Sequence, residues 1–493
     1  MSAMSQPDIP KIIPNWIDGL ESGTPADETF GKRSPVTGRE ICRVARSRSG
    51  EVNRAIDSAA KSFSAWSAQT PVMRGNHLLA VTQAMRRHRD DIAAIVAAET
   101  GMSFNAAGAE TEGAIALGEF MAGEGRRLYG RSTTSAVPHK TAMTMREPMG
   151  VAGLIIPANT PIANVAWKVF PALVCGNTAV LKAAEDTPAT AWFFGKLAHT
   201  AGLPPGVLNI IQGLGEEAGT ALVADPRVAV VSFTGSTAVG RQIAQVAGSR
   251  LAKVSLELGG KNPFIVCDDA DLELAAKWAI LSAFSNAGQR CAAGSRIIIF
   301  EPVYERFRDM LIERTRRLKV GPGNDADFGP VINAEQLQAM VSAVEQARAG
   351  GAAILTGGGR MDDPVHAGGF YMAPTLIEKV HPEAEISTHE IFGPVACLYQ
   401  ARDFTEAVDL ANRSPYGLTA CIHTRSIHRA LEFVRRVQAG VAVVNAGTFG
   451  SEPHMPFGGV KQSGTGSREP GTEALDVYSN LKTIYIAIDP IQV

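Results

Sequence analysis

The segment Gly288–Arg296 places a single cysteine where it could act as a nucleophile. Cys291 has glycine, alanine, glutamine, serine and arginine around it and follows a helix-like run over Leu274–Asn286. A thiol on such a loop can meet a substrate, whereas a cysteine inside an apolar run is usually inert packing. Small neighbours leave room for a tetrahedral intermediate beside the sulfur. A structural cysteine is the alternative, and the other motifs decide between the two.

Two further segments could supply groups that assist such a thiol. Glu257 is flanked by Val254, Leu256 and Leu258, and a carboxylate in apolar surroundings tends to have a raised pKa and can serve as a general base. Asn159, in a turn flanked by prolines, could donate a hydrogen bond to a developing oxyanion. The plainer alternatives are a strand-end glutamate that reaches solvent and an ordinary turn asparagine.

Two segments have features of a nucleotide site. Phe233–Gly240 joins an apolar strand to a helix, where glycines admit a phosphate and the helix N-terminus favours an anion. Its spacing differs from the usual dinucleotide fingerprint. Lys182 and Glu185 follow another strand, at the end where α/β sheets bind ligands. A carboxylate there can accept hydrogen bonds from ribose hydroxyls and repel a 2′-phosphate. The alternative for Phe233–Gly240 is a helix start capped by Ser236, and the alternative for Lys182 and Glu185 is a solvated turn that caps a helix.

These motifs lie on a regular alternation of strands and helices, which is typical of a parallel sheet covered on both faces. After Gly150 the pattern predicts, in order, a strand over Val151–Ile156, a helix over Ala163–Leu173, a strand over Thr178–Leu181, a helix over Thr187–Ala201, and strands over Val207–Ile211, Val228–Phe233 and Lys253–Leu258, with helices over Glu217–Ala224 and Ala238–Ala247 between the last three. A second series follows Cys291 and predicts a second α/β domain, joined near Gly259–Pro263.

The remaining segments complete the predicted organisation. Residues 1–50 are turn-rich, with a turn at Asp18-Gly19, and the pattern becomes helical from Glu51 to Tyr129. Thr141–Glu147 and Thr483–Ile488 both alternate like exposed strands. They could pair as a small flap, and an exposed apolar edge of that kind commonly pairs with another subunit.

Length and composition set the broad class. A chain of 493 residues is too long for one simple core, so two or three domains are expected. A net charge of −2 with dispersed basic residues indicates neither a nucleic-acid nor a membrane surface. The six cysteines form no CxxC pair, which predicts no disulfide framework, no metal site and a reducing compartment. Residues 1–11 have no signal-peptide pattern, so we expect a soluble cytoplasmic protein.

Taken together, the motifs resemble those of the NAD(P)-dependent aldehyde dehydrogenase superfamily, in family order and through nearly the whole chain. They are Pro-x-Asn-x-Pro at 157–161, Lys-x-x-Glu at 182–185, Phe-Thr-Gly-Ser-Thr-x-x-Gly at 233–240, Glu-Leu-Gly-Gly-Lys at 257–261, Gly-Gln-x-Cys at 288–291, Glu-x-Phe-Gly-Pro at 390–394 and Pro-Phe-Gly-Gly at 456–459. Ordered motifs at these intervals are a far stronger signal than any one of them.

The resemblance implies a chemical role for four side chains. Cys291 would attack the aldehyde, and the Asn159 amide with the Cys291 backbone N–H would hold the thiohemiacetal oxyanion. Hydride transfer to NAD would leave a thioester, which water activated by Glu257 would hydrolyse to a carboxylic acid. Lys168 aligns with a family lysine near the active site.

Three other functions stay open. An acylating enzyme would transfer the thioester to coenzyme A, although such relatives usually lack a base at the position of Glu257. A cysteine hydrolase would need a histidine partner, and His389 and His423 sit in no recognisable motif. A catalytically silent binding or structural protein on the same fold would have no chemical reason to keep Cys291, Glu257 and Asn159 together.

The resemblance also implies the cofactor site, the domains and the assembly. Lys182 and Glu185 would hold the adenosine ribose, with Glu185 favouring NAD; Ser236 would hold the pyrophosphate, and Glu390 and Phe392 the nicotinamide ribose and ring. The other cofactor positions implied are Ile155, Ile156, Pro157, Ala184, Phe233, Gly235, Gly240 and Leu258. A Rossmann-type NAD-binding domain would span 1–129 and 149–258, a catalytic α/β domain 259–460, and an oligomerisation flap 130–148 and 475–493, forming a homodimer or homotetramer.

Departures from the family pattern concern the substrate tunnel. Ala158 stands where an aromatic is frequent, so one contact to the cofactor is expected to be missing. The tunnel positions are Thr160, Ala163, Asn164, Trp167, Arg290, Phe449, Glu452 and Phe457, several of them smaller or more polar than is common. They predict a bulky or polar aldehyde as substrate. The segment 466–471 carries one residue more than the common pattern, and no role is assigned to Glu469.

Overall fold

The first large sheet holds the strands predicted after Gly150. The computed structural model describes residues 9–22 and 28–488. The order of the sheet is β12-β11-β8-β9-β10-β2-β3, and the first five of these strands are parallel. Their bounds are β8 (Val151–Ile155), β9 (Thr178–Lys182), β10 (Leu208–Ile211), β11 (Val228–Thr234), β12 (Lys253–Glu257), β2 (Asn15–Ile17) and β3 (Leu20–Ser22).

The sequence predicts a parallel sheet, but one edge of this sheet is antiparallel. Strands β2 and β3 extend it in the antiparallel sense from β10. The turn between them is the Asp18-Gly19 pair, with φ angles of 56° and 75°, a conformation that suits a tight hairpin. The turn was expected from the sequence, whereas the partner strand across the sheet was not.

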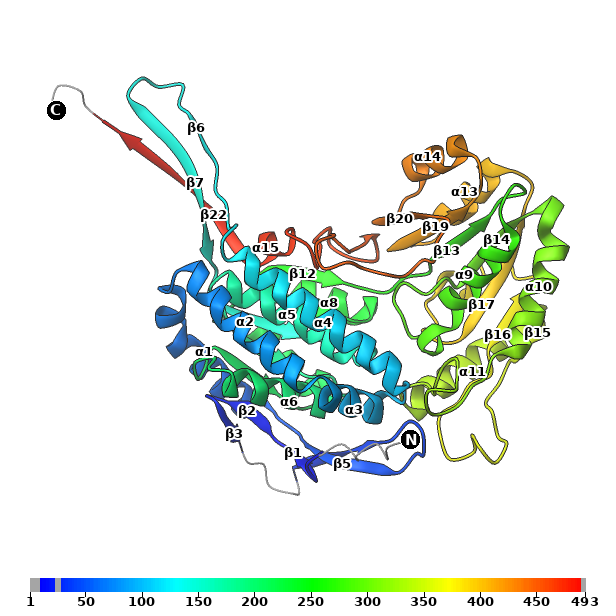
Figure 1. Ribbon diagram of the computed structural model, residues 1–493, viewed down its shortest axis with the longest axis horizontal. Helices are drawn as coiled ribbons and strands as arrows, with labels where there is room; N and C mark the ends of the chain where they lie inside the picture. The colour runs from blue at the N-terminus through cyan, green and yellow to red at the C-terminus, as the bar shows by residue number, and fades with distance from the viewer. Residues whose placement is uncertain (1–8, 23–27, 489–493) are drawn as a thin grey trace.

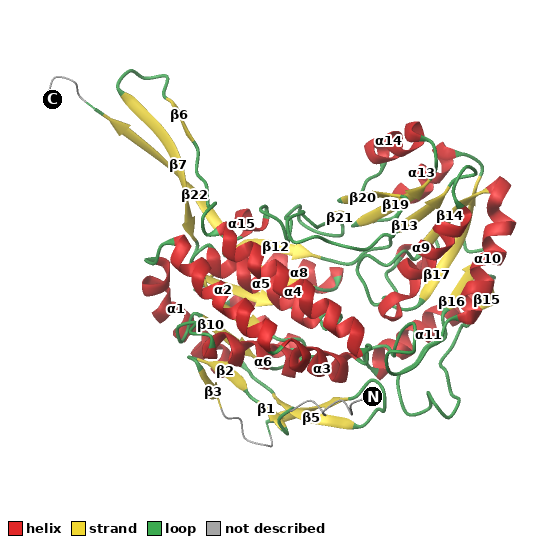
Figure 2. Ribbon diagram, in the orientation of Figure 1, coloured by secondary structure: helices red, strands yellow, loops and turns green. Residues whose placement is uncertain are grey.

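Helices cover both faces of the first sheet. Figure 2 shows α2, α4, α5 and α6 over one face, and the core between them and the sheet is aliphatic and aromatic. Helices α1, α7 and α8 pack on the opposite face around a separate core. The bounds are α1 (Ser49–Ser67), α2 (Pro71–Arg87), α3 (Arg89–Thr100), α4 (Phe104–Glu124), α5 (Pro161–Val174), α6 (Pro188–Thr200), α7 (Thr220–Ala224) and α8 (Thr237–Ser249).

A second large sheet follows the turn after β12. Its order is β15-β16-β17-β14-β13-β19-β20, parallel except for the edge strand β15. Its strands are β13 (Pro263–Val266), β14 (Arg296–Phe300), β15 (Ala353–Thr356), β16 (Thr375–Glu378), β17 (Val395–Ala401), β19 (Thr419–His423) and β20 (Val441–Val444), and its helices are α9 (Leu272–Phe284), α10 (Tyr304–Arg317), α11 (Ala334–Ala349), α12 (Glu385–Thr388), α13 (Phe404–Asn412) and α14 (Ile427–Arg436).

A three-stranded flap projects from the body formed by these two sheets (Figure 1). Strand β22 (Ser479–Ala487) runs antiparallel to β7 (Lys140–Pro148), with Ile484 opposite Met143, and β6 (Ser132–Thr134) pairs with the other edge of β7. The two alternating segments therefore pair as predicted. Residues 489–493 of the predicted flap and residues 1–8 of the N-terminal expectation lie outside the described residues.

Smaller elements connect these units. Strands β1 (Ile12–Ile13), β5 (Glu40–Ala45) and β4 (Thr29–Arg33) form a three-stranded sheet, and β18 (Tyr416–Gly417) pairs with β21 (Val460–Lys461). The last helix, α15 (Ala474–Val477), contributes to the core beside α5. In the described part of the chain, no helix is both long enough and apolar enough to span a bilayer.

Candidate active site

The loop that carries the candidate nucleophile has an unusual backbone. After α9 ends at Phe284, residues Asn286, Ala287 and Gly288 have φ angles of 54°, 53° and 67°. Left-handed conformations at non-glycine residues cost free energy and persist where the surrounding structure imposes them. A side chain at Gly288 would collide with the backbone of Gly393. The conformation of the loop is thus set by its contact with the segment before β17, and it places Cys291 at the wall of a cavity.

Cys291 is partly exposed, whereas the other five cysteines are buried. Its carbonyl accepts a hydrogen bond of 2.8 Å from Asn262 Nδ2, which anchors the loop to the start of β13. Burial, followed by the carboxylates of Glu390 and Glu257, raises the pKa of the Cys291 thiol to about 12. The thiol is therefore protonated at rest, and attack on a carbonyl requires a group that removes its proton.

Asn159 lies against the same loop. Its Nδ2 donates to the Gln289 carbonyl at 3.0 Å, and its own carbonyl accepts from Asn286 Nδ2 at 3.1 Å. An amide nitrogen carries two hydrogens, so one remains for an oxygen atom beside Cys291. The side chain lines the same cavity as the thiol, which is the placement that an oxyanion donor needs.

Asn164 does not line that cavity, in contrast to the tunnel position expected for it. The residue is buried on α5, and its Nδ2 donates to the Thr160 carbonyl at 2.9 Å and to Asn159 Oδ1 at 3.5 Å. The side chain points back along its own helix, where the Thr160 carbonyl accepts from both the backbone N–H and the side-chain amide of Asn164 and the Thr160 hydroxyl accepts from the amide at 3.0 Å. It therefore orients the Asn159 amide and does not form the tunnel wall.

Glu257 is the last residue of β12, and its side-chain carboxyl has no hydrogen-bond partner among the described residues. The residue is 4% exposed, and neither carboxylate oxygen is paired. Burial raises its pKa well above the usual value, and the negative charge of Glu469 adds to the effect. An unpaired buried carboxyl is costly unless it has a task, and a raised pKa is what a general base working near neutral pH requires.

A buried network behind Glu257 was missed by the sequence reasoning. Lys168 Nζ donates to Glu469 Oε2 at 3.0 Å and to Ser232 Oγ at 2.7 Å, and Glu469 Oε1 accepts from Ser232 at 2.8 Å and from Tyr478 at 3.1 Å. Lys168 is 1% and Glu469 0% exposed. No spacing rule connects residues so far apart in sequence, so only the fold reveals that the segment 466–471 provides the counter-ion of Lys168.

We expect opposite effects on the pH profile when the two halves of this ion pair are removed. Glu469→Gln deletes a negative charge near Glu257 and leaves Lys168 uncompensated, so the acidic limb of kcat should move to lower pH. Lys168→Met leaves Glu469 uncompensated and should move that limb to higher pH. Each variant should also lose about 3–5 kcal/mol of unfolding free energy, since breaking a buried pair strands a charge.

The measurement is kcat against pH, with urea unfolding of the same samples. Glu313→Gln, on an exposed turn of α10, serves as the control for a carboxylate lost from the surface. Limbs that moved in the same direction in both variants would contradict electrostatic coupling to Glu257.

The cavity beside Cys291 has a volume of about 610 Å³. Except for Asn164, the predicted tunnel residues line it, namely Thr160, Ala163, Trp167, Arg290, Phe449, Glu452 and Phe457. The rings of Trp167 and Phe457 meet edge to face with centroids 5.5 Å apart. One face of α4, made of small residues, forms a wall that the sequence reasoning missed: Ala106, Ala109, Gly113 and Ala116. Their small side chains give the cavity its width.

A second candidate region lies where the strand order of the first sheet reverses. From β8 the chain proceeds outward to β9 and β10 on one side and later to β11 and β12 on the other. In open α/β sheets, ligands bind at such a switch point, beyond the carboxyl ends of the strands. The cofactor positions predicted between Ile155 and Leu258 all leave the carboxyl ends of β8, β9, β11 and β12.

Individual side chains there suit a dinucleotide. Lys182 Nζ and the Gly215 N–H both donate to Glu185 Oε1 at 2.6 Å. The second carboxylate oxygen of Glu185 is left for ribose hydroxyls. Helix α8 begins directly after Ser236 and presents its N-terminus, and a side chain at Gly235 would collide with Phe233. This cradle of backbone N–H groups, with a carboxylate nearby, fits a pyrophosphate and a ribose without a 2′-phosphate.

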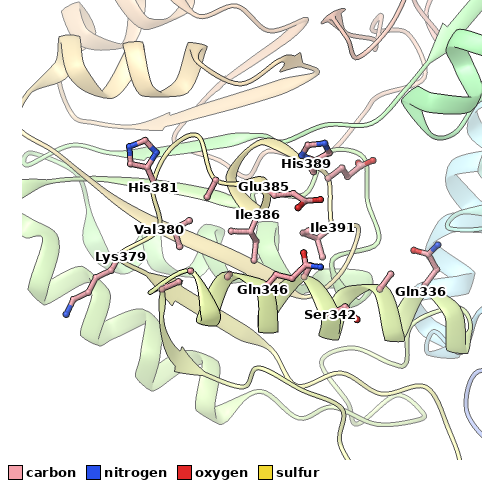
Figure 3. A pocket seen from close by; sticks show the side chains of 17 residues that line it. Gln336, Ser342, Gln346, Lys379, Val380, His381, Glu385, Ile386, His389 and Ile391 are labelled. Atoms are coloured by element: carbon pink, nitrogen blue, oxygen red, sulfur yellow. The ribbon is translucent and has the colours of Figure 1, made fainter.

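Glu390 connects this region to the second sheet. Its Oε1 accepts from the Gly260 N–H at 3.0 Å, and burial raises its pKa to about 7. Phe392 lies two residues further on with a φ of 54°. A side chain at Gly259 would collide with Glu390, which explains one glycine of the pair after β12. Glu390 also lines a hollow of about 550 Å³ over α11 and α12 (Figure 3).

The two histidines considered for a cysteine hydrolase lie away from the thiol. His389 lines the hollow of Figure 3, whereas neither histidine is among the residues that line the Cys291 cavity. His423 Nε2 faces the Ala446 carbonyl at 3.1 Å, and its ring stacks on Phe264. Burial lowers the pKa of His423 to about 4. The site therefore provides Cys291 with carboxylates and amides, and with no imidazole base.

Comparisons with known proteins agree with this geometry. The chain matches the model of the aldehyde dehydrogenase family over residues 23–484. It is 39% identical to an alpha-ketoglutaric semialdehyde dehydrogenase of Bacillus subtilis over 96% of this chain and 97% of the relative. It is 38% identical to a 2,5-dioxopentanoate dehydrogenase of Saccharolobus solfataricus over 88% of this chain and 91% of the relative.

Solved structures show the same architecture. A crystal structure of betaine aldehyde dehydrogenase from Staphylococcus aureus in complex with NAD+ superposes with a TM-score of 0.94, at 32% identity, over 97% of this chain and 95% of the other. The predicted fold class, with a Rossmann-type sheet, a second α/β sheet and a small β flap, is confirmed.

Proposed function

The chain belongs to the aldehyde dehydrogenase family, and from this premise we propose how its own residues carry out the oxidation of an aldehyde with NAD. The enzyme is an NAD-dependent aldehyde dehydrogenase. The observation that carries the assignment of roles is the convergence of one partly exposed thiol, one amide donor that contacts its loop, and one unpaired buried carboxyl whose charge raises the pKa of that thiol.

Cys291 is the nucleophile. Its sulfur forms a bond to the aldehyde carbon as its proton passes through water to the solvent. The carbonyl oxygen becomes an oxyanion held by Asn159 Nδ2 and the Cys291 backbone N–H. NAD bound at the switch point of the first sheet would supply the hydride acceptor, and loss of the hydride from this carbon would leave a thioester on Cys291. Asn164 keeps the Asn159 amide oriented throughout.

Glu257 then removes a proton from the water that attacks the thioester. The C–S bond breaks, the carboxylic acid leaves, and the thiol is restored. Because no described group bonds to the carboxyl of Glu257, both of its carboxyl oxygens are left for water. Lys168 and Glu469 act as positioning residues behind this carboxyl, because they set the charge around it and touch no reacting atom.

Cofactor binding falls to the crevice at the switch point of the first sheet. Lys182 and Glu185 hold the adenosine ribose, the N-terminus of α8 at Ser236 holds the pyrophosphate, and Glu390 with Phe392 orients the nicotinamide end. Glu185 selects NAD over NADP because a 2′-phosphate would meet a carboxylate. Ala158 provides no aromatic contact to the cofactor.

The substrate is a polar aldehyde. The cavity wall carries Arg290, Glu452 and Thr160 beside its aromatic residues, and the small face of α4 leaves room for a bulky chain. Two relatives are named for alpha-ketoglutaric semialdehyde and 2,5-dioxopentanoate, which supports a polar substrate over a plain alkyl one.

The test is NADH formation from a panel of aldehydes, with and without coenzyme A, and with NADP beside NAD. Turnover without coenzyme A supports the hydrolytic enzyme, and higher kcat/KM for polar aldehydes supports the substrate class. Turnover that requires coenzyme A would support the acylating alternative. No turnover under either condition would support a silent protein. Higher efficiency with short unfunctionalised aldehydes would refute the polar substrate.

We place the enzyme in the cytoplasm. We also propose that it assembles as a homodimer or homotetramer through the flap. Two sheet edges support an assembly: the outer edge of β22, where Leu481, Tyr485 and Ile486 are exposed, and the edge strand β20, where Val444 is exposed. Such edges invite pairing between chains. Sedimentation analysis that found only monomers at micromolar concentration would contradict it.

We propose the same domain limits that the sequence suggests, with one segment added to the NAD-binding domain. The NAD-binding domain spans 1–129 and 149–258, the catalytic domain 259–460 and the flap 130–148 with 475–493. The segment after residue 460 returns to the first sheet, where the Leu258 N–H donates to the Ser463 carbonyl at 2.9 Å. We therefore assign residues 461–474 to the NAD-binding domain.

A further inference from the structure

The wall of the Cys291 cavity holds polar atoms that no protein group satisfies. Arg290 Nε, Ser285 Oγ and Glu110 Oε2 are buried without a hydrogen-bond partner, and all three residues line the cavity. Buried polar groups are almost always paired. Two of these atoms, Arg290 Nε and Ser285 Oγ, are donors, so this wall of the cavity lacks hydrogen-bond acceptors.

Arg290 is the strongest of these groups. It directly precedes Cys291 in the sequence, and its guanidinium lies 5.1 Å from the centre of the Phe449 ring. Stacking on the ring face holds the guanidinium plane while leaving its N–H edge free. Within the described ranges, no carboxylate oxygen is within 4.0 Å of it. Among the described residues that line the cavity, Arg290 is the only cation.

The acids that face Arg290 do not neutralise it. Glu110 Oε1 accepts from the Ile162 and Ala163 N–H groups at 2.9 and 3.1 Å, so the start of α5 occupies that oxygen. Burial raises the pKa of Glu110 to about 8, which leaves it largely uncharged near neutral pH. Asp327 and Glu452 are solvent-exposed, where water and salt screen their charge.

We propose that Arg290 binds a carboxylate on the substrate, so that the preferred aldehydes are ω-oxo acids with the carboxylate at the far end of a short chain. The inference rests on the proposed function of Cys291 and deepens it. The guanidinium fork matches a carboxylate in geometry, and the Ser285 hydroxyl is a further donor on the same wall.

The charge balance of the cavity favours a carboxylate over a phosphate. One cation matches one negative charge, so a dianionic phosphate would leave one of its charges without a partner. The small residues of α4 also line this cavity, and their apolar surface suits a methylene chain.

The first arm of the test measures binding without turnover. Glutarate, and glutaramide as its uncharged counterpart, are titrated calorimetrically into wild type, Arg290→Met, Arg290→Lys and Arg317→Met. Arg317 lies on the exposed end of α10 and is the matched control. We expect glutarate to bind at least tenfold more weakly to Arg290→Met, with Arg290→Lys in between and Arg317→Met like wild type, as loss of a charge-assisted pair implies. Equal binding of glutarate to wild type and Arg290→Met would overturn the proposal.

The second arm compares kcat/KM for glutarate semialdehyde and pentanal. The ratio of the two values should exceed one in wild type and fall on the order of tenfold to a hundredfold in Arg290→Met, mainly through KM. An equal loss on both aldehydes would overturn carboxylate recognition, because Arg290 would then serve the thiol. If no aldehyde is oxidised while glutarate binding still depends on Arg290, the proposed function fails and the anion site stands.

Discussion

Cys291→Ala is expected to abolish NADH formation with every aldehyde, by a factor on the order of 10⁴ or more, because no other described residue that lines the cavity carries a thiol to form the thioester. The structure supports this size of effect. The other five cysteines are buried, and the histidines considered as alternatives lie elsewhere. Steady-state rates of the variant and wild type, measured with the same aldehyde and NAD, give the comparison.

Cys267→Ala is the matched control, since it removes a thiol from the core of the second sheet. It should lose some stability and keep its activity. Thiol modification adds an independent check, because Cys291 should react before the other cysteines. Its pKa, raised to about 12 by burial and by two carboxylates, predicts a modification rate that still rises at pH 9. A rate that levelled off near pH 7 would show that the resting thiol is already ionised.

Glu257→Gln should separate the two halves of the reaction. The amide keeps the size of the side chain and cannot take a proton, so acylation should proceed once while hydrolysis of the thioester slows by roughly 10²–10⁴-fold. Stopped-flow measurement should therefore show a burst of one NADH for each active site, followed by a slow steady rate. Added hydroxylamine, which attacks thioesters directly, should restore part of that rate.

The wild type gives the matching pH profile. Because burial and Glu469 raise the pKa of Glu257, hydrolysis should be slow at acidic pH, where the carboxyl is protonated, and should accelerate as pH rises through that pKa. Glu313→Gln should show neither a burst nor a shifted profile. A loss of the burst itself in Glu257→Gln would mean that this residue is already needed when Cys291 attacks.

Local sequence was sufficient for most of the secondary structure and for a prediction of the reacting groups. The five strands predicted after Gly150 follow from short apolar runs, and the observed bounds of each differ from the expected ones by one residue. The motifs around Cys291, Glu257 and Asn159 are also local, since each consists of neighbouring residues whose types limit the possible chemistry. The flap could be predicted because both of its long strands alternate over their whole length.

Only the tertiary structure decided which distant residues meet. The pairing of Lys168 with Glu469, the partner strands β2 and β3, and the small face of α4 all depend on contacts between segments separated by tens to hundreds of residues. Asn164 faces its own helix start instead of the cavity, because the carbonyl and the hydroxyl of Thr160 accept from its amide there. The sequence by itself determined the fold class and the family, and it predicted the nucleophile. The tertiary structure determined the charges around the reacting carboxyl and the unpaired guanidinium, because burial and pairing exist only once the chain is folded.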